Sequence, residues 1–419
     1  MNKKDGVVYT PAEIVKEMLS KIKIGKEILE PSCGEGAFLN EIDCDSNIDG
    51  FDIDKEALLK IKNKKVNIYC EDFLTHIFSK KYDTIIGNPP YIKIQDLDSK
   101  YREFLQKNFY SCSSGNIDIF YAFIEKCISL LKENGEMILI VPNSWILNKS
   151  AKNLREILSK YEVEITDFGS EKKFKDADIY TCFIYLKKKS GNIILKRNKK
   201  QEVIEKTSEP WVFKTDTQIK IDLNIIKNGI ATLCDKIFIF DKYEIKENTY
   251  KVLCSYNKKE YEIEKGIIRR CAKISKEKNN ICIYPYKNNG EKITEDKLKN
   301  TFPLAYNYLL DVKEKLLERD FDDEWYNYGR SQGISTMYGN KILISNCVFD
   351  KVKIFFSDDK ELVAYSGLYI NVENSSKEEI QKIFDYFNSE NILSYIKENG
   401  KSIGGNYKTF SKTLLKLIN

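Results

Sequence analysis

An apolar strand that runs directly into Asn-Pro-Pro-Tyr constrains this chain more than any other segment. Thr84-Ile85-Ile86 is a short β-branched run in front of Gly87, which predicts a buried strand of a parallel sheet. Two prolines follow; they lack a backbone N–H, hold φ at roughly −65° and force each preceding residue to be extended. Asn88 through Tyr91 should therefore form a rigid turn at the carboxyl end of the strand, the edge at which α/β sheets bind ligands.

This turn carries three groups that suit a planar amine. The Asn88 carboxamide and the Pro89 carbonyl are acceptors that could take both hydrogens of an amino group, localise the nitrogen lone pair and direct it at an electrophile. The Tyr91 ring offers a flat face for stacking. The competing interpretation is an ordinary proline turn after a strand, and the neighbouring strand ends bear on the choice.

Three expected strands precede this turn, and each ends in residues that suit a nucleoside. Strand 28–30 leads into Pro31-Ser32-Cys33-Gly34-Glu35-Gly36, a glycine turn predicted to continue into a helix. Strand 48–54 places an acid, Asp52, about 20 residues after the glycine turn, a spacing that suits a carboxylate accepting from ribose hydroxyls. Asp54 in the same segment is also a candidate helix cap. Strand 66–70 ends in Glu71-Asp72-Phe73-Leu74.

The rest of the first half alternates strands and helices. Thr10-Pro11-Ala12-Glu13 predicts a capping box with proline at the first helical position. Apolar periodicity predicts a helix over 116–131, a turn at 132–135, strand 136–141, a helix around 154–158, and strands 163–168 and 179–186. The pattern predicts an α/β fold with a Rossmann-like, seven-stranded sheet.

A charged segment, 187–209, separates this half from a different pattern. Beyond it lie short β-type runs at 237–240, 281–284, 341–345, 354–356 and 368–370, and a helix at 377–387. We therefore expect two domains, 1–214 and 215–419, the second of the α+β class.

Composition excludes several classes of protein. Lys and Arg number 68 against 63 Asp and Glu, a net charge of +5 that suits a polyanionic partner or a solvated surface equally. The 11 cysteines are odd in number and contain no Cys-x-x-Cys pair, so neither a disulfide framework nor a zinc site is indicated. One histidine, His76, is expected at the surface. No signal segment and no run of about 18 apolar residues appears, which argues against secretion and membrane insertion.

The order of these motifs resembles that of γ-class, TaqI-type DNA adenine-N6 methyltransferases, which use S-adenosylmethionine. The resemblance is carried by the segments Glu30–Gly36, Phe51–Asp54, Asp72–Leu74 and Asn88–Tyr91, in that order after the N-terminal helix. It is specific over the first 190 residues or so and looser beyond. It implies a methyltransferase domain at 1–214 and a DNA target-recognition domain at 215–419.

The resemblance also implies roles for individual residues. Thr10 would lie against the methionine end of the cofactor; Glu30, Ser32, Gly34 and Gly36 match the glycine-turn motif; Asp52 would hold the ribose; Asp72 and Phe73 would contact the cofactor's adenine; and Asn88, Pro89 and Tyr91 would be catalytic, with Asn88 also beside the cofactor. Phe174 matches a second aromatic residue on the target base, so a flipped adenine would lie between Tyr91 and Phe174.

Candidate DNA contacts in the second half are Arg269, Arg270, Arg330, Asn406, Tyr407 and Lys408. Arginine is scarce in this chain, and its planar fork suits guanine or phosphate. The competing interpretation of each arginine is a surface ion pair. Asn406 lies where family members place a residue near the unpaired partner base, although a relative has proline there.

Methyl transfer from a sulfonium needs no metal and no strong base, so no metal is expected. The resemblance implies double-stranded DNA as substrate, a monomer in the prokaryotic cytoplasm associated with the nucleoid, and a restriction-modification context in which a separate nuclease is possible. Protein glutamine-N5, RNA and cytosine-N4 methyltransferases could use the same Asn-Pro-Pro-Tyr chemistry, and a DNA-binding subunit without turnover is the non-enzymatic alternative. The motif directly before the glycine turn and about 200 residues after the first domain argue against the glutamine enzyme.

Overall fold

The chain forms two compact units, Met1–Phe213 and Lys214–Asn419. The computed structural model describes residues 9–43, 45–174, 179–207, 209–215, 219–274, 278–319, 321, 324–403 and 407–418. The boundary between the units lies one residue from the boundary expected from the sequence. Within the described ranges, every helix is too short or too polar to span a lipid bilayer.

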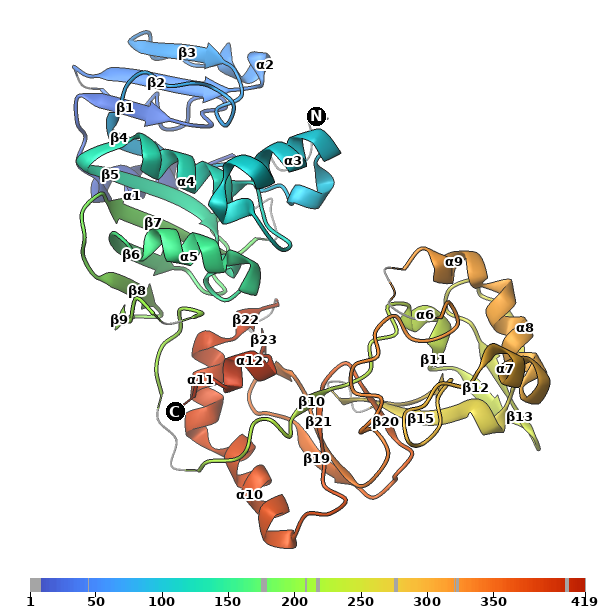
Figure 1. Ribbon diagram of the computed structural model, residues 1–419. Helices are drawn as coiled ribbons and strands as arrows, with labels where there is room; N and C mark the ends of the chain where they lie inside the picture. Colours follow the sequence, from blue (N-terminus) through green and yellow to red (C-terminus); the bar gives the residue numbers. More distant parts are fainter. Residues whose placement is uncertain are drawn as a thin grey trace. The chain divides into compact units, whose positions relative to one another are not determined.

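A nine-stranded mixed sheet organises the first unit, in the order β3-β2-β1-β4-β5-β7-β6-β8-β9 (Figure 1). Its strands are β1 Glu27–Glu30, β2 Asn47–Asp52, β3 Val66–Cys70, β4 Tyr82–Gly87, β5 Leu131–Pro142, β6 Glu162–Asp167, β7 Thr181–Lys187, β8 Ile193–Arg197 and β9 Lys200–Ile204. β1 to β5 pair in parallel, β7 is antiparallel to β5 and β6, and β8 runs parallel to β6. The α/β methyltransferase-type fold expected from the sequence is confirmed.

Two features of this sheet differ from the expectation. The charged segment after β7 forms the hairpin β8–β9, in which Ile193, Leu195 and Ile204 are buried. Residues 132–135, predicted to be a turn, lie within strand β5. Asn134 there adopts a positive φ of 60°, next to a shift in the β4–β5 register.

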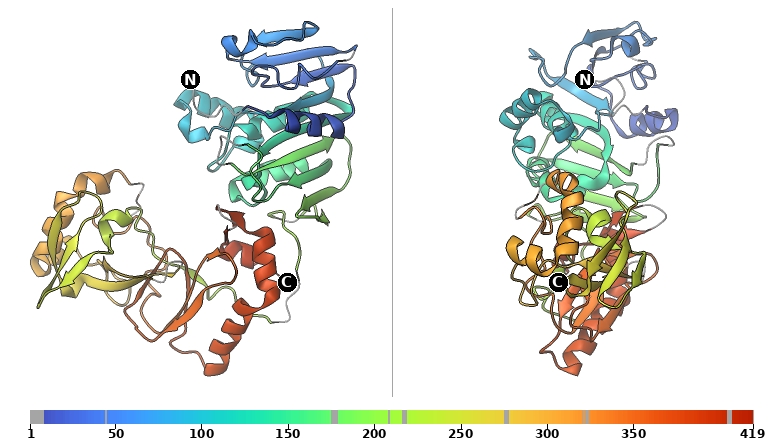
Figure 2. Two further views of the ribbon diagram at one scale, coloured as in Figure 1. Left: turned by 180° about the vertical axis from the view of Figure 1, so that it is seen from behind. Right: turned by 90° about the vertical axis from the view of Figure 1, so that its right-hand side faces the viewer.

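Helices cover both faces of the sheet. They are α1 Ala12–Lys21, α2 Lys55–Leu58, α3 Ser99–Asn108, α4 Phe120–Leu130 and α5 Lys152–Leu158. Figure 2 shows α1 on the opposite side of the sheet from α4. Successive strand residues divide between the two cores accordingly: Ile85 packs with α4 and α5, whereas Ile86 packs with α1. Burial on both sides explains why β4 reads as a continuous apolar run.

The second unit contains four small sheets and seven helices among its described residues. Its strands are β10 Lys227–Asn228, β11 Ile239–Phe240, β12 Tyr243–Ile245, β13 Thr249–Leu253, β14 Glu260–Glu264, β15 Ile268–Lys273, β16 Lys278–Ile283, β17 Lys341–Ile344, β18 Cys347–Val348, β19 Ile354–Ser357, β20 Val363–Tyr365, β21 Leu368–Asn371, β22 Lys401–Ser402 and β23 Lys408–Thr409. Its helices are α6 Asp235–Phe238, α7 Glu295–Thr301, α8 Pro303–Asp311, α9 Lys313–Leu317, α10 Lys377–Asn388, α11 Glu390–Asn399 and α12 Lys412–Leu415.

This unit is α+β, as expected, with one local difference. The run 237–240 was predicted to be a strand, but Ile237 and Phe238 complete the short helix α6 and only Ile239 and Phe240 pair with β16. All four side chains are buried in the core of this unit. The four residues are apolar because they are buried, and burial alone does not distinguish a helical turn from a strand.

Candidate active site

Two turns meet where the direction of the strand order reverses in the sheet. β1 and β4 are neighbours, and the chain leaves their carboxyl ends through the Pro31–Gly36 turn and through Asn88–Tyr91. The Ser32 hydroxyl donates to the backbone oxygen of Asn88 at 3.0 Å and so joins the two turns. Such a point of reversal is where open α/β sheets form a ligand crevice.

The Asn88 carboxamide is held on both sides. Its Nδ2 donates to the Thr10 Oγ1 at 3.1 Å, and its Oδ1 accepts from the Tyr91 hydroxyl at 2.5 Å. The predicted capping box is wrong: α1 has Pro11 at its N-cap and no side-chain cap. The Thr10 hydroxyl is instead a partner of Asn88, which the sequence resemblance had placed in the same site.

The Tyr91 hydroxyl faces two acceptors with one proton. Besides Asn88 Oδ1, it lies 3.1 Å from the backbone oxygen of Ile140 on β5. The ring lies edge-on to Phe120 of α4 at a centroid distance of 6.3 Å, and burial raises the pKa of the phenol well above its ordinary value. The ring is therefore fixed in place as a neutral phenol beside Asn88.

Both acceptors of the turn have capacity for an amine. The Pro89 carbonyl accepts no hydrogen bond within the described part of the chain. Asn88 Oδ1 accepts from the Tyr91 hydroxyl and, as a carboxamide oxygen, carries two lone pairs. An amino group at this turn could therefore donate one hydrogen to each oxygen.

The glycine turn has room for a ligand. Gly34 adopts a φ of +49°, and a Cβ built there would meet no atom within 4 Å. Gly36 adopts a φ of +79°, where a Cβ would come within 2.9 Å of Ile61. These two positive φ values also explain why residues 34–41 form successive turns in place of the predicted helix.

Asp52 at the end of β2 lies beside this turn. One carboxylate oxygen accepts from the Gly34 N–H at 2.8 Å, and the other accepts from the Asp54 N–H at 2.9 Å. Each oxygen has a further lone pair that vicinal hydroxyls could use. Asp54 caps α2 by accepting from the N–H groups of Glu56 and Ala57, as the alternative interpretation of this residue expected.

Glu30 is buried at the end of β1 with an unsatisfied oxygen. The residue is 2% exposed, and its Oε2 has no hydrogen-bond partner in the part of the chain that the structure describes. Burial, and then the negative charge of Asp52, raise the pKa of Glu30 well above 4.5. An unsatisfied buried oxygen beside the glycine turn is typical of a site that binds a polar ligand.

Burial of Glu30 should make the free energy of unfolding of the ligand-free protein depend on pH. The folded state holds the Glu30 proton more tightly than the unfolded state does. Between the pKa of Glu30 in the unfolded chain and its higher pKa in the folded protein, the free energy of unfolding should therefore fall by about 1.4 kcal/mol for each unit of increasing pH. Glu30→Gln should lack this decline, so its advantage over wild type should be larger at pH 8 than at pH 5. Urea unfolding of both proteins at the two pH values measures the difference.

The exposed Glu41 on the same segment provides a control for this comparison. Glu41→Gln should follow the wild-type pH dependence. If Glu30→Gln also follows the wild-type curve, Glu30 is ionised in the folded protein and the inference from its burial is wrong.

Asp72 already has two hydrogen-bond donors. Its Oδ1 accepts from the Leu74 N–H at 2.8 Å, and its Oδ2 accepts from the Tyr101 hydroxyl of α3 at 2.6 Å. Sequence reasoning missed Tyr101, because the contact spans 29 residues and no motif marks it. Phe73 is 2% exposed and packs its ring between Phe51, Phe78 and Phe123.

His76 lies in the same loop and is not the surface residue expected. Its side chain is 24% exposed, its Nδ1 is 2.7 Å from Glu71 Oε2, and its ring contacts Phe51 and Phe78. It belongs to the aromatic cluster behind the Asp72 loop.

Phe174 lies on the other side of the sheet from the core that Tyr91 borders. It is 2% exposed and packs in the cluster of α1, with Ile138 and Phe183, whereas Tyr91 packs against the α4 core. The described structure therefore does not bring the two rings together, and their joint contact with a base stays a prediction.

The candidate DNA contacts of the second unit are found in two settings. Arg270 pairs with Asp359 through Nε at 3.0 Å and Nη2 at 2.6 Å, and Arg269 approaches Glu361 at 3.4 Å, which are the ion pairs of the competing interpretation. Arg330 is half-buried and donates to the Gly329 carbonyl at 3.1 Å.

The candidates near the C-terminus are equally mixed. Tyr407 is exposed and its ring contacts Phe349. Lys408 is 8% exposed and donates to Ser402 Oγ at 2.7 Å, and this burial argues against a direct contact between Lys408 and DNA. Asn406 lies outside the described residues.

Residues 21–174 match the family model of the Eco57I restriction-modification methylase. The chain is 27% identical over 365 residues to the type II restriction enzyme and methyltransferase RM.Eco57I of Escherichia coli, an alignment that covers 72% of this chain and 36% of that enzyme. It is 27% identical over 460 residues to the type II methyltransferase M.HincII of Haemophilus influenzae, covering 99% of this chain and 88% of the relative.

A solved structure shares the fold over almost all of the chain. It is the type IIL restriction-modification enzyme MmeI in complex with DNA, with a TM-score of 0.63, 14% identity, and coverage of 97% of this chain and 64% of that one. At this identity the likeness concerns the fold.

Proposed function

We propose that this chain, whose residues 21–174 match the restriction-modification methylase family model, transfers a methyl group from S-adenosylmethionine to N6 of an adenine in double-stranded DNA. The observation that carries this proposal is the turn after β4. It presents a Pro89 carbonyl that accepts no hydrogen bond within the described residues, together with the Asn88 carboxamide oxygen and a fixed Tyr91 ring, beside the glycine turn.

The first unit fits S-adenosylmethionine at the edge formed by β1, β2 and β3. The open face of Gly34 and the orphaned Glu30 Oε2 leave polar and steric room for the methionine portion. Asp52 would hold the ribose hydroxyls through its remaining lone pairs, and Asp72 and Phe73 would border the cofactor's adenine, as in the family it resembles. When bound, the cofactor supplies an electrophilic methyl group.

The residues of the turn position the nucleophile. Asn88 Oδ1 and the Pro89 carbonyl accept the two amino hydrogens, so the nitrogen lone pair is directed out of the plane of the base. The Thr10 hydroxyl keeps the Asn88 carboxamide from rotating, because it accepts from Nδ2. No residue has to remove a proton before the methyl group is transferred, because the amine becomes acidic once it is alkylated.

Tyr91 gives the reaction its aromatic surface. A base inside a duplex cannot reach this turn, so it must leave the stack, as the substrates of methyltransferases do. Stacking contributes roughly 1–3 kcal/mol per base and offsets part of the unstacking. Phe174 would complete the pocket only after its ring leaves the α1 cluster.

The second unit is proposed to recognise the DNA sequence. Its support is the length of the match to M.HincII, which extends over 99% of this chain, and the arginines on β15. Arg269 and Arg270 would have to exchange their carboxylate partners, Glu361 and Asp359, for DNA.

The product of the reaction tests the proposal. The purified protein is incubated with methyl-labelled S-adenosylmethionine and unmethylated genomic duplex DNA, which is then digested to nucleosides. We expect labelled N6-methyl-2′-deoxyadenosine from DNA treated with wild type; absence of any methylated base after treatment with the folded protein would overturn the proposal. Sequencing that detects modified bases, in a host expressing the protein, would identify the target sequence.

The alternative substrates are tested by the products of the DNA assay and of parallel assays that contain RNA or protein. N4-methylcytosine would replace adenine as the target, since the turn suits either exocyclic amine. Label in RNA or in protein glutamine, with none in DNA, would reject DNA as the substrate. Asn88 in place of serine before the prolines favours adenine, as does the resemblance.

A further inference from the structure

The hairpin β8–β9 places a basic turn at the same edge of the sheet as the active site. β8 runs parallel to β6, which shares the direction of β5 and β4 through β7. The carboxyl end of β8 therefore lies at the edge that carries Asn88–Tyr91. There the chain reads Lys196-Arg197-Asn198-Lys199-Lys200, and its last three residues are exposed.

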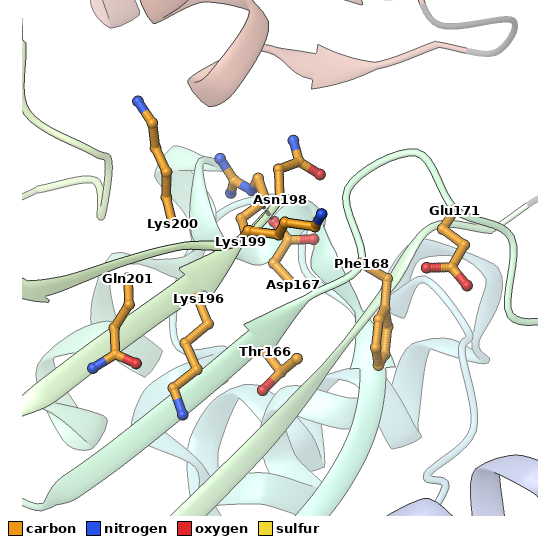
Figure 3. A pocket seen from close by; sticks show the side chains of 10 residues that line it. Thr166, Asp167, Phe168, Glu171, Lys196, Asn198, Lys199, Lys200 and Gln201 are labelled. Carbon is orange, nitrogen blue, oxygen red and sulfur yellow. Dashed lines mark hydrogen bonds and ion pairs between the residues drawn. The ribbon is translucent and has the colours of Figure 1, made fainter.

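A hollow of about 330 Å³ lies beside this turn. The ends of β6, β8 and β9 line it with four cationic side chains and two carboxylates. Figure 3 shows that Lys196 and Gln201 extend to one side of the hairpin and Lys200 to the other. One carboxylate, Asp167, is 5% exposed and neutralised by Arg197 Nε at 2.6 Å. The hollow therefore offers a net positive surface.

Lys199 occupies a backbone position that favours glycine. Asn198 and Lys199 have φ values of 49° and 67°, the left-handed pair of a tight hairpin in which Asn-Gly is the preferred sequence. A lysine here carries backbone strain that glycine would avoid. Lys199 is exposed and makes no ion pair within the described part of the chain, whereas Lys196 is paired with Glu164 at 2.7 Å. The charge of Lys199 is therefore available to a ligand.

Buried hydrogen bonds connect this hairpin to the loop after β6. Asp167 accepts from Arg197 of β8, from Asn143 Nδ2 at 2.8 Å and from the Gly169 N–H at 2.8 Å. Gly169 begins the segment that leads to Phe174. These hydrogen bonds join the end of β8 to the residue at which the segment that would complete the base pocket begins.

We propose that the hollow at the β8–β9 turn, with Lys199 as its free cation, binds a backbone phosphate of the DNA strand that carries the target base. This rests on the proposed function, because it requires DNA as the substrate. The positive surface lies at the catalytic edge of the first unit itself, so it would hold the backbone near the flipped nucleotide independently of sequence recognition by the second unit.

The salt dependence of DNA binding tests this assignment. Lys199→Gly removes the charge and suits the backbone, so the hairpin should stay folded. We expect its log Kd against log salt to lose about one unit of slope, with similar weakening for cognate and unrelated duplexes and an unchanged Kd for S-adenosylmethionine. Lys199→Arg, which keeps the charge, should retain the wild-type slope.

A lysine next to β3, at the other end of the strand order from β9, provides the control. Lys64 is exposed in the segment that precedes β3, and Lys64→Gly removes the same charge. If both glycine variants lose the same slope, the effect reflects net charge alone and the proposed phosphate site is wrong. An unchanged slope for Lys199→Gly would also reject the site. If wild type methylates DNA while Lys199→Gly keeps the wild-type slope, this inference fails and the proposed function stands. If wild type neither binds nor methylates DNA, both fail.

Discussion

Asn88→Ala is expected to lower kcat for DNA methylation by about 10²–10³-fold while S-adenosylmethionine still binds. The substitution removes an acceptor that is fixed in advance by Thr10 and Tyr91, and removal of one such preorganised group from an active site has effects of this size. The Pro89 carbonyl remains, so one amino hydrogen keeps its acceptor and the lone pair is no longer directed. Single-turnover methylation and calorimetric titration of the cofactor measure the two quantities separately.

Two variants make the result specific to the Asn88 oxygen. Thr10→Ala removes only the partner of Asn88 Nδ2 and should have a smaller effect on kcat, about tenfold, because the acceptor stays in place. Asn108→Ala at the exposed end of α3 should leave kcat unchanged. A parallel loss of cofactor affinity in Asn88→Ala would assign Asn88 to the cofactor pocket instead.

Asp52→Ala is expected to raise the Kd of S-adenosylmethionine by about 100-fold. Hydrogen bonds to a charged group contribute about 1.5–3 kcal/mol each, and loss of a pair of them with partial compensation by water amounts to about 3 kcal/mol. The substitution also removes the acceptor of the Gly34 N–H, so the glycine turn loses a fixed point. At saturating cofactor kcat should change much less, because the hydrogen bonds of Asp52 within the described residues go to Gly34 and Asp54 and not to the turn after β4.

Asp54 gives this experiment a control two residues away. Asp54→Ala removes the cap of α2 and should lower the unfolding free energy by about 1 kcal/mol with little change in cofactor affinity. If the two alanine variants bind the cofactor equally well, Asp52 is not the ribose ligand. If both lose affinity equally, the effect is one of local folding at the end of β2.

Strand positions in the first unit follow from local sequence, and local differences have local causes. β3 was predicted at residues 66–70 and lies at Val66–Cys70, because an apolar, β-branched run between polar turns has few other conformations. The helix expected after the glycine turn does not form, because Gly34 and Gly36 adopt positive φ. The hairpin β8–β9 was overlooked because its lysines and glutamates hide the alternating burial of β8 and the single buried residue of β9, Ile204.

By itself, the sequence determined the backbone of the Asn88–Tyr91 turn and the chemistry at the strand ends. Proline geometry and apolar periodicity are local properties, and they place Asn88, Asp52 and Asp72 at the ends of strands without knowledge of the strand order. The family resemblance added the cofactor and the substrate class.

Only the tertiary structure decided which of these groups meet. The contact between Thr10 and Asn88 spans 78 residues, and that between Asp72 and Tyr101 spans 29, so both depend on the order β3-β2-β1-β4 and on the packing of α1 and α3. It also decided that Glu30 Oε2 is buried without a hydrogen-bond partner, and that Lys199 makes no ion pair, among the residues that the structure describes. Burial and proximity arise when distant segments pack, and no local pattern in the chain records them.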